Sequence, residues 1–284
     1  MKRPKAVALP KVRRAYCDGP HGQVHYRIAA PQRPRKPPLV CLHQTPKSGM
    51  DYEPIMPLLA QDRVVLAPDT PGYGGSDPPS RPIGIPAFAR FAALFIGTMR
   101  HAGFIGSEPV DVMGYHTGCI TAAELATSQP TLVRKLVMVS LPAFDARERS
   151  EHLAQLDRFP TPRADASHVG DLWRVMETLH DSRVGLDWKH ASLAEALRPG
   201  ARLPWGFKAV YEYDFLATLD RLRNPVLLLC PGDDLWEPTQ RHHDRIANLT
   251  MIEKPGAAHG FLLVDAQEVA EEIRQFLDQR PPRP

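Results

Sequence analysis

The sequence has few of the features that mark a secreted, membrane-bound or nucleic-acid-binding protein. It has four cysteines and no C-x-x-C pair, and Cys41 and Cys230 lie inside apolar runs, where a thiol behaves as a small hydrophobic side chain. No apolar run approaches the ~18 residues of a membrane-spanning helix, and the formal net charge is only +3. We therefore expect a cytoplasmic protein that binds neither membrane nor nucleic acid.

The basic residues are concentrated in segments without aromatic neighbours. Met1–Arg14 and Arg33–Lys36 combine Arg and Lys with proline, and we interpret them as a solvated tail and a solvated loop. The chain has 284 residues, of which 43% are hydrophobic, enough for one large domain with an insertion. It contains no internal repeat, and we expect a monomer or a homodimer.

Apolar strand-like runs alternate with helical segments along most of the chain. A hairpin is predicted at Arg14–Ala29, and further strands at Pro38–Leu42, Arg63–Ala67, Val110–Met113, Val133–Val139, Pro225–Cys230 and Leu249–Glu253. Helices are predicted at Asp51–Ala60, Pro86–Phe104, Thr117–Ser128 and Ala266–Leu277. This alternation is typical of an α/β fold with a mostly parallel sheet covered on both faces, here with eight strands.

The alternation stops after the sixth strand. Residues 143–222 contain only helical segments, at Ala146–Leu156, Asp165–Leu179, Ser192–Leu197 and Phe207–Leu222. We therefore predict a core built from residues 1–142 and 223–284, with a helical cap at 143–222 inserted between its two parts.

A sharp strand-to-helix turn is predicted at Gly114-Tyr115-His116-Thr117-Gly118. Its layout is that of the G-x-S-x-G nucleophile elbow, in which two glycines let the backbones pass closely and the central side chain stands at the top of the sheet. The central position here is His116, where the motif has serine. A histidine keeps the geometry and changes the chemistry.

Two further loops that follow strands carry residues suited to catalysis. Asp233 and Asp234 follow the Pro225–Cys230 strand, and His259 lies between the last strand and the last helix. A carboxylate bound to one imidazole nitrogen fixes the tautomer and leaves the second nitrogen to take a proton. His43-Gln44-Thr45-Pro46 follows the Pro38–Leu42 strand at the same edge of the sheet.

With these motifs in this order, the chain resembles the capped branch of the α/β-hydrolase superfamily, which includes esterases, lactonases and epoxide hydrolases. The resemblance covers nearly the whole chain and implies an eight-stranded α/β-hydrolase fold. The family order of nucleophile, acid and histidine falls here on His116, Asp234 and His259. The resemblance also implies an oxyanion hole made by the backbone N–H groups of Thr45 and Thr117.

Several roles remain open for His116. It could attack a carbonyl directly, or pair with His259 as acid and base without a covalent intermediate. It could join His259 and Asp234 as metal ligands, although orienting His259 already occupies Asp234. Thr117 or Cys119 could replace it as nucleophile, or the site could have lost its nucleophile altogether.

We expect the substrate to be a small, apolar or weakly polar ester, lactone or related acyl compound. The residues expected to contact it are Gln44, Tyr115, Leu141, Trp236 and Phe261. We expect no cofactor and no metal. The alternatives to a hydrolase are a non-hydrolytic acid–base enzyme, such as a lyase or a cofactor-independent oxygenase, and a catalytically silent ligand-binding member of the fold.

Overall fold

The computed structural model describes residues 8–279; the predicted basic tail extends beyond this range at residues 1–7, and residues 280–284 also lie outside it. The eight strands form one sheet in the order β1-β2-β4-β3-β5-β6-β7-β8. The strands are β1 (Arg13–Gly19), β2 (Gly22–Ala29), β3 (Leu39–Leu42), β4 (Val65–Pro68), β5 (Val110–Tyr115), β6 (Val133–Val139), β7 (Val226–Pro231) and β8 (Leu249–Lys254).

Most of this sheet is parallel. β1 and β2 form the predicted antiparallel hairpin, and β2 also pairs antiparallel with β4. The pairs from β4 to β8 are all parallel. The central strands β3 to β7 are buried along almost their whole length because helices cover both of their faces. The predicted eight-stranded, mostly parallel α/β-hydrolase sheet is confirmed.

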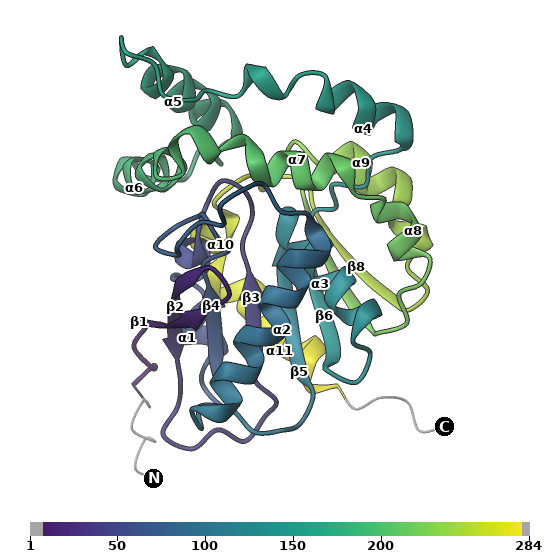
Figure 1. Cartoon of the computed structure of the whole chain (residues 1–284). Coiled ribbons are helices and arrows are strands. Elements are labelled where there is room, and N and C mark those ends of the chain that lie inside the picture. Colours follow the sequence, from purple (N-terminus) through teal and green to yellow (C-terminus); the bar gives the residue numbers. More distant parts are fainter. Residues whose placement is uncertain (1–7, 280–284) are drawn as a thin grey trace.

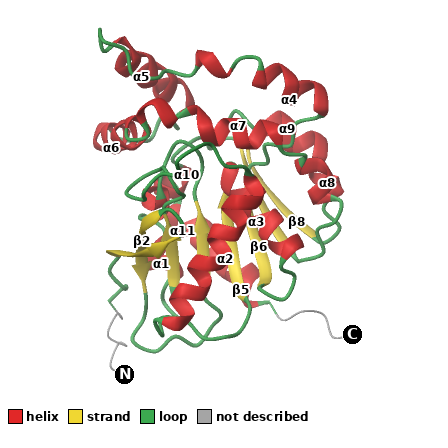
Figure 2. Cartoon of the chain, viewed as in Figure 1, coloured by secondary structure: helices red, strands yellow, loops and turns green. Residues whose placement is uncertain are grey.

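Two apolar clusters cover the two faces of the sheet (Figures 1 and 2). One face packs against α2 (Ile85–His101) and α3 (Thr117–Ser128), which also contact each other. The other face packs against α1 (Met56–Leu59) and α11 (Ala266–Asp278). Two short helices, α9 (Trp236–His242) and α10 (Phe261–Val264), complete the loops that follow β7 and β8.

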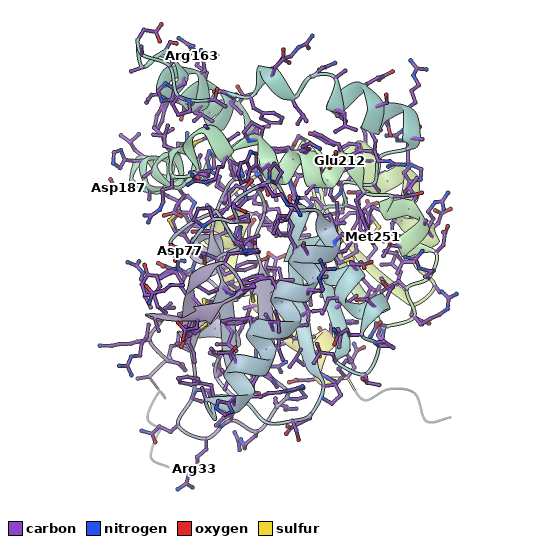
Figure 3. The ribbon with its side chains drawn as sticks, in the orientation of Figure 1. Arg33, Asp77, Arg163, Asp187, Glu212 and Met251 are labelled. Atoms are coloured by element: carbon purple, nitrogen blue, oxygen red, sulfur yellow. The ribbon has the colours of Figure 1, made fainter. Side chains whose placement is uncertain are left out.

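Only helices lie between β6 and β7. They are α4 (Ala146–Leu153), α5 (Ser167–Leu179), α6 (Leu186–Leu197), α7 (Pro204–Glu212) and α8 (Phe215–Leu219). In Figure 1, α4 to α7 form a layer above the carboxyl ends of the strands. Figure 3 labels Arg163 and Asp187 on the outer side of this layer. All five helices fall within the predicted cap segment 143–222, and the division of the chain into domains stays a prediction.

Three predicted helices have different limits in the structure. The helix predicted at Asp51–Ala60 is a 3-10 turn at Gly49–Tyr52 followed by the one-turn helix α1, because Pro54 and Pro57 interrupt the chain. The segment Phe207–Leu222 divides into α7 and α8, and the Asp214 carboxylate caps α8. The helix predicted at Ser192–Leu197 is the end of the longer α6. No helix in residues 8–279 combines the length and the apolar character needed to cross a membrane.

Candidate active site

The turn between β5 and α3 has the close backbone approach that the glycines of the motif predict. A Cβ on Gly118 would lie 1.9 Å from the Leu42 carbonyl oxygen, and one on Gly114 would lie 2.4 Å from the Gly118 backbone. His116 adopts φ 47 and ψ −109 at the apex of the turn. This strained conformation is held by the packed strand and helix on either side of it. The imidazole therefore occupies the position that the nucleophile has in the elbow motif.

His116 has a carboxylate partner that the sequence analysis did not assign. Its Nε2 lies 2.9 Å from Asp233 Oδ2. The Ser140 hydroxyl donates to the same oxygen at 2.7 Å, and the Leu235 N–H donates to Asp233 Oδ1 at 2.9 Å. The Asp233 side chain is fully buried. The sequence signal for this partner was the pair of consecutive aspartates after Gly232. With two histidines at the site, each aspartate could bind one of them.

His259 pairs with the aspartate that the sequence predicts. Its Nε2 lies 2.7 Å from Asp234 Oδ1. The imidazole side chain is 11% exposed and the Asp234 side chain 47% exposed. The loops after β7 and β8 bring the two residues together because these strands are neighbours in the sheet. The structure thus contains two histidine–carboxylate pairs, His116–Asp233 and His259–Asp234.

The two imidazoles face each other across a short gap. Their ring centroids are 5.0 Å apart and their planes are nearly perpendicular, at 78°. Tyr115 supports both rings, with centroids 4.8 Å from His116 and 6.1 Å from His259. Because both hydrogen bonds to aspartate engage Nε2, Nδ1 of each ring is left without a hydrogen-bond partner in residues 8–279.

The carboxylates determine the protonation of the His116 pair. Burial alone lowers the pKa of His116, but the adjacent Asp233 carboxylate outweighs burial and raises this pKa above its ordinary value. Burial raises the pKa of Asp233, and the His116 charge and hydrogen bond bring it below its ordinary value. The pKa of Asp234 is also well below its ordinary value, since the hydrogen bond from His259 outweighs burial. The site therefore favours ionised carboxylates and a protonated His116.

A cavity of about 580 Å³ opens over this pair between the sheet and the cap. Its volume suits a small-molecule ligand. Most of its wall is apolar, including Leu172, Val175, Met176, Leu179, Phe207 and Leu263. The cap helices contribute most of these side chains, so the cap covers the two histidines and limits the access of water.

Most of the predicted site residues line this cavity, and four do not. Those on the wall are Gln44, Thr45, Tyr115, His116, Asp234 and His259, while Thr117, Leu141, Trp236 and Phe261 are not part of it. These positions do not support contact of Leu141, Trp236 and Phe261 with the substrate, which stays a prediction. Leu141 is fully buried in the core, Phe261 packs behind Tyr115 with ring centroids 6.1 Å apart, and Trp236 is half-buried at the start of α9.

The predicted oxyanion donors belong to the two loops that flank the elbow. Thr117 is the first residue of α3, so its N–H is one of the first-turn amides that have no partner within the helix. Thr45 lies on the cavity wall. Next to it, the Gln44 amide donates to Asp51 Oδ2 at 3.1 Å, which places a fixed amide at the same wall. The oxyanion role of Thr45 and Thr117 stays a prediction.

Several polar residues of the cavity wall were not found from the sequence, and four of them form a group at the contact between cap and core. Lys47 and Asp51 come from the segment after β3, and His180 and Ser192 come from the cap. Lysine, aspartate and serine in a loop or on a helix surface are ordinary solvent-facing residues, and no local pattern distinguished these ones. Only the contact between cap and core makes them a group.

The two histidine–carboxylate pairs also form a set of side chains that could hold a divalent cation. One ligand atom from each of His116, Asp233, Asp234 and His259 lies within 4.8 Å of the others. Two imidazoles and two carboxylates suit Zn²⁺ or another transition metal. In this arrangement, however, each Nε2 that would bind a metal makes a hydrogen bond to a carboxylate. The geometry is that of two proton-sharing pairs.

Comparisons with known proteins agree with the fold and the elbow. Residues 39–272 match the model of the alpha/beta hydrolase family. A poly(3-hydroxyalkanoate) depolymerase from Ectopseudomonas oleovorans is 27% identical over 266 residues, covering 88% of this chain and 89% of that protein. A pimeloyl-[acyl-carrier protein] methyl ester esterase from Neisseria meningitidis serogroup A is 26% identical over 255 residues, 80% of this chain and 72% of that protein.

A solved structure agrees over almost the whole chain. A hydrolase from Pseudomonas aeruginosa PA01 has a TM-score of 0.75 and 20% sequence identity, covering 94% of this chain and 98% of the other. At this identity the likeness concerns the fold. The match to the family model covers most of the chain and includes the elbow and both loops of the site. The chain therefore belongs to the alpha/beta hydrolase family.

Proposed function

We propose that the protein hydrolyses a small ester, lactone or related acyl bond by general acid–base catalysis with its two histidines. The observation that carries this proposal is that each histidine has its own aspartate, His116 with Asp233 and His259 with Asp234. In a nucleophilic triad, one carboxylate orients the histidine base, and that base activates the nucleophile. Two separate pairs instead suit two proton-transfer groups that act on one substrate.

His259 is the base in this proposal. Asp234 binds its Nε2 and stabilises the imidazolium that forms when the ring takes a proton. The free Nδ1 takes that proton from a water molecule, which attacks the acyl carbon. The apolar wall of the cavity strengthens this electrostatic interaction by excluding other water.

His116 is the acid. Its pKa is raised by Asp233, so the ring carries a proton at a higher pH than an ordinary histidine. In this proposal the imidazolium at the elbow stabilises the negative charge that develops on the acyl oxygen by a hydrogen bond from Nδ1–H. When the tetrahedral intermediate collapses, this proton moves to the leaving alkoxide. The proton that His259 took from water then passes to His116, directly or through solvent, which restores both rings. Attack by His116 itself would require the neutral ring, which the Asp233 carboxylate disfavours.

The relatives support the substrate class. One of them is named a methyl ester esterase and another a poly(3-hydroxyalkanoate) depolymerase. The mostly apolar cavity between cap and sheet also favours a compact acyl substrate with few charges at the reacting bond. We therefore place the reaction among the carboxylic ester hydrolases.

The test is hydrolysis of short p-nitrophenyl esters and small lactones by the wild type and by the His116→Ala and His259→Ala variants. We expect turnover that falls at least about a hundredfold in either variant, the usual contribution of a general acid or base. Rapid mixing should show no burst of p-nitrophenolate, and rapid-quench mass spectrometry no acyl adduct. A stoichiometric burst with an adduct on His116 would overturn the acid–base route.

Two controls separate the remaining explanations. Removal of metals with a chelator, with metal content measured before and after, should leave turnover unchanged; loss of turnover with recovery on adding Zn²⁺ would contradict the proposal. A His116→Ser variant restores the family motif. If only that variant hydrolyses esters and the wild type does not, the natural reaction is not ester hydrolysis.

A second function is favoured because the elbow position holds His116 and not a residue with a hydroxyl or thiol nucleophile. An acid and a base on opposite sides of a substrate also move a proton between carbon and oxygen, as a lyase requires. Exchange of the α-hydrogens of ketone ligands with deuterated water, dependent on His259, would identify this chemistry. Ligand binding with neither hydrolysis nor exchange would indicate a catalytically silent protein.

A further inference from the structure

A second polar group lines the cavity that contains the two histidines. Lys47, from the loop after β3, donates from Nζ to the Ser192 carbonyl oxygen at 3.2 Å and also to the Ser192 hydroxyl. Ser192 belongs to the cap helix α6, and its Oγ lies 3.4 Å from His180 Nε2. All three residues belong to the cavity wall. Cap and core thus meet here through a buried lysine.

The hydrogen-bond directions show which of these residues carries charge. His180 Nδ1 donates to the Met176 carbonyl oxygen at 2.7 Å, so Nε2 of the neutral ring is an acceptor. Burial and the nearby Lys47 lower the pKa of His180 to about 4, which keeps this ring neutral. The Ser192 hydroxyl therefore donates to His180 and accepts from Lys47. Lys47 is the cation of the group.

The charge of Lys47 is only partly compensated. In the described part of the chain both of its hydrogen-bond partners are neutral atoms of Ser192, and it forms no ion pair. Burial lowers the pKa of Lys47 to about 8, even though Asp51 and Glu195 act in the opposite direction. A buried ammonium group without a contacting anion is unfavourable. A ligand that supplies a carboxylate would compensate the charge.

Asp51 does not serve as that anion. Its Oδ2 accepts a hydrogen bond from the Gln44 amide, and it makes no ion pair with Lys47. The Asp51 charge affects the pKa of Lys47 and also that of His116. Asp51 is therefore close enough to influence both groups, and the lysine group adjoins the reacting centre within one cavity.

We propose that Lys47 and Ser192 form a subsite for a carboxylate group of the substrate. The ammonium group has three N–H donors, of which Ser192 engages two, and the third is left for a ligand oxygen. The Ser192 hydroxyl donates to the second oxygen if it turns away from His180 Nε2, with which it makes a long contact of 3.4 Å. This inference rests on the proposed function and narrows its substrate class to esters or lactones whose acyl part carries a second, free carboxylate.

The competing explanation is that Lys47 only fastens α6 to the core. A fastening role predicts equal effects of Lys47 on every substrate, whereas a carboxylate subsite predicts a larger effect on substrates with the second acid group. The test therefore compares two series of equal length. One consists of monomethyl esters of straight-chain dicarboxylic acids from succinate to suberate, and the other of methyl esters of the corresponding monocarboxylic acids.

In the wild type we expect at least one acid ester to be hydrolysed with a higher kcat/KM than its neutral counterpart. Lys47→Met removes the charge and shortens the side chain by one atom. It should lower kcat/KM for the acid esters by about tenfold to a hundredfold, the loss expected for a charge-assisted hydrogen bond. For the neutral esters we expect a smaller loss, so that the preference for acid over neutral esters, as the ratio of their kcat/KM values, falls by at least about fivefold. Equal losses in both series would overturn the subsite.

A binding measurement separates this inference from the proposed function. Isothermal titration calorimetry with free glutarate and adipate, beside the neutral diamides, requires no turnover. We expect the dicarboxylates to bind the wild type and Lys47→Arg, and binding to Lys47→Met to be at least about tenfold weaker. If turnover of all esters is absent but this binding is present, the subsite stands and the hydrolase proposal fails. If neutral esters are hydrolysed but no dicarboxylate binds, the hydrolase proposal stands and the subsite proposal fails.

Lys47→Met needs a control for folding. Ser192→Ala removes one hydroxyl and leaves the Lys47 charge in place, so it should weaken dicarboxylate binding by less than Lys47→Met. Circular dichroism and the Tm of both variants show whether α6 remains attached. If Lys47→Met is unfolded, Lys47→Gln replaces it, and retained dicarboxylate binding in a folded, uncharged variant would overturn the proposal.

Discussion

At the scale of single residues, position 116 shows how one side chain changes the chemistry of a backbone turn that keeps the geometry of the elbow motif. The two glycines of the elbow have the close contacts that the motif requires, irrespective of the residue between them. A serine there would rely on His259 as its base. Histidine has its own buried partner, Asp233, which the Ser140 hydroxyl holds in position. The site therefore contains two separate histidine–carboxylate pairs.

Asp233→Asn should change the pH dependence of the reaction. Asp233 is the main cause of the raised pKa of His116. A raised pKa means that the imidazolium is present at low pH and is lost as the pH rises through this value. If His116 is the acid, kcat/KM falls along this alkaline limb, and Asp233→Asn should move the limb to lower pH.

The pH profile of kcat/KM on one ester measures this shift. Asp187→Asn, on the exposed outer side of the cap (Figure 3), is the matched control and should leave the profile unchanged. A nucleophilic His116 would give the opposite sign, because the neutral ring would then be required. Activity would rise with pH through the pKa of His116, and Asp233→Asn would extend activity to lower pH.

At the scale of secondary-structure elements, the cap and the His259 loop are connected through the backbone. The His259 N–H donates to the Leu179 carbonyl oxygen at 3.3 Å, and the His259 carbonyl accepts from the Asp181 N–H at 2.9 Å. Arg183 then bridges Asp181 and Asp265, the residue between α10 and α11. The end of α5 is thus attached to the His259 loop by two backbone hydrogen bonds.

Arg183→Ala should loosen this connection. The guanidinium makes hydrogen bonds of 2.6 and 2.8 Å to the two oxygens of Asp265. Without them we expect faster hydrogen exchange in the His259 loop and at the end of α5, and a kcat lowered about threefold to tenfold through misplacement of the ring. Arg147→Ala, which breaks an exposed i,i+4 pair on α4, is the control. Unchanged exchange in Arg183→Ala would show that the backbone bonds alone hold the loop.

At the scale of the whole molecule, the two histidine–carboxylate pairs and the cations that hold α11 lie at opposite edges of the sheet. The histidine pairs lie at the carboxyl ends of the strands, under the cap. At the other edge, Lys135 Nζ donates to the carbonyl oxygens of Phe276 at 2.7 Å and Gln279 at 2.8 Å. Arg134 donates to the Leu277 carbonyl at 2.9 Å. These cations satisfy the last carbonyls of α11 and attach it to β6.

Lys135→Met should lower stability and leave catalysis unchanged. The variant keeps the aliphatic stem and removes the Lys135 hydrogen bonds to the Phe276 and Gln279 carbonyl groups, at a cost of about 1–3 kcal/mol in the free energy of unfolding. Denaturant unfolding measures this cost, and kcat/KM on the preferred ester measures catalysis. A threefold fall in kcat/KM corresponds to about 0.65 kcal/mol at the transition state. A larger fall would show that the two edges of the sheet are coupled.

The order of strands and helices and the elbow followed from local sequence, and the Asp234–His259 pair followed from the resemblance to the α/β-hydrolase superfamily. Period and turn signals are local, and a motif such as Gly114–Gly118 contains its own geometry. The alternation of strands and helices leaves few topologies open, so the parallel sheet could also be predicted. The boundaries failed where prolines or caps decide them, as at Pro57 and Asp214.

The remaining features depended on contacts between segments far apart in the chain. Asp233 meets His116 across 117 positions, and Lys47 meets Ser192 across 145. No local pattern encodes such pairs, because each residue is ordinary in its own segment. The sequence by itself determined the fold and the elbow, since backbone geometry is a local property. Only the tertiary structure decided which carboxylate lies beside each histidine, because the fold brings these separate loops together. The protonation of each histidine depends on that proximity and on burial.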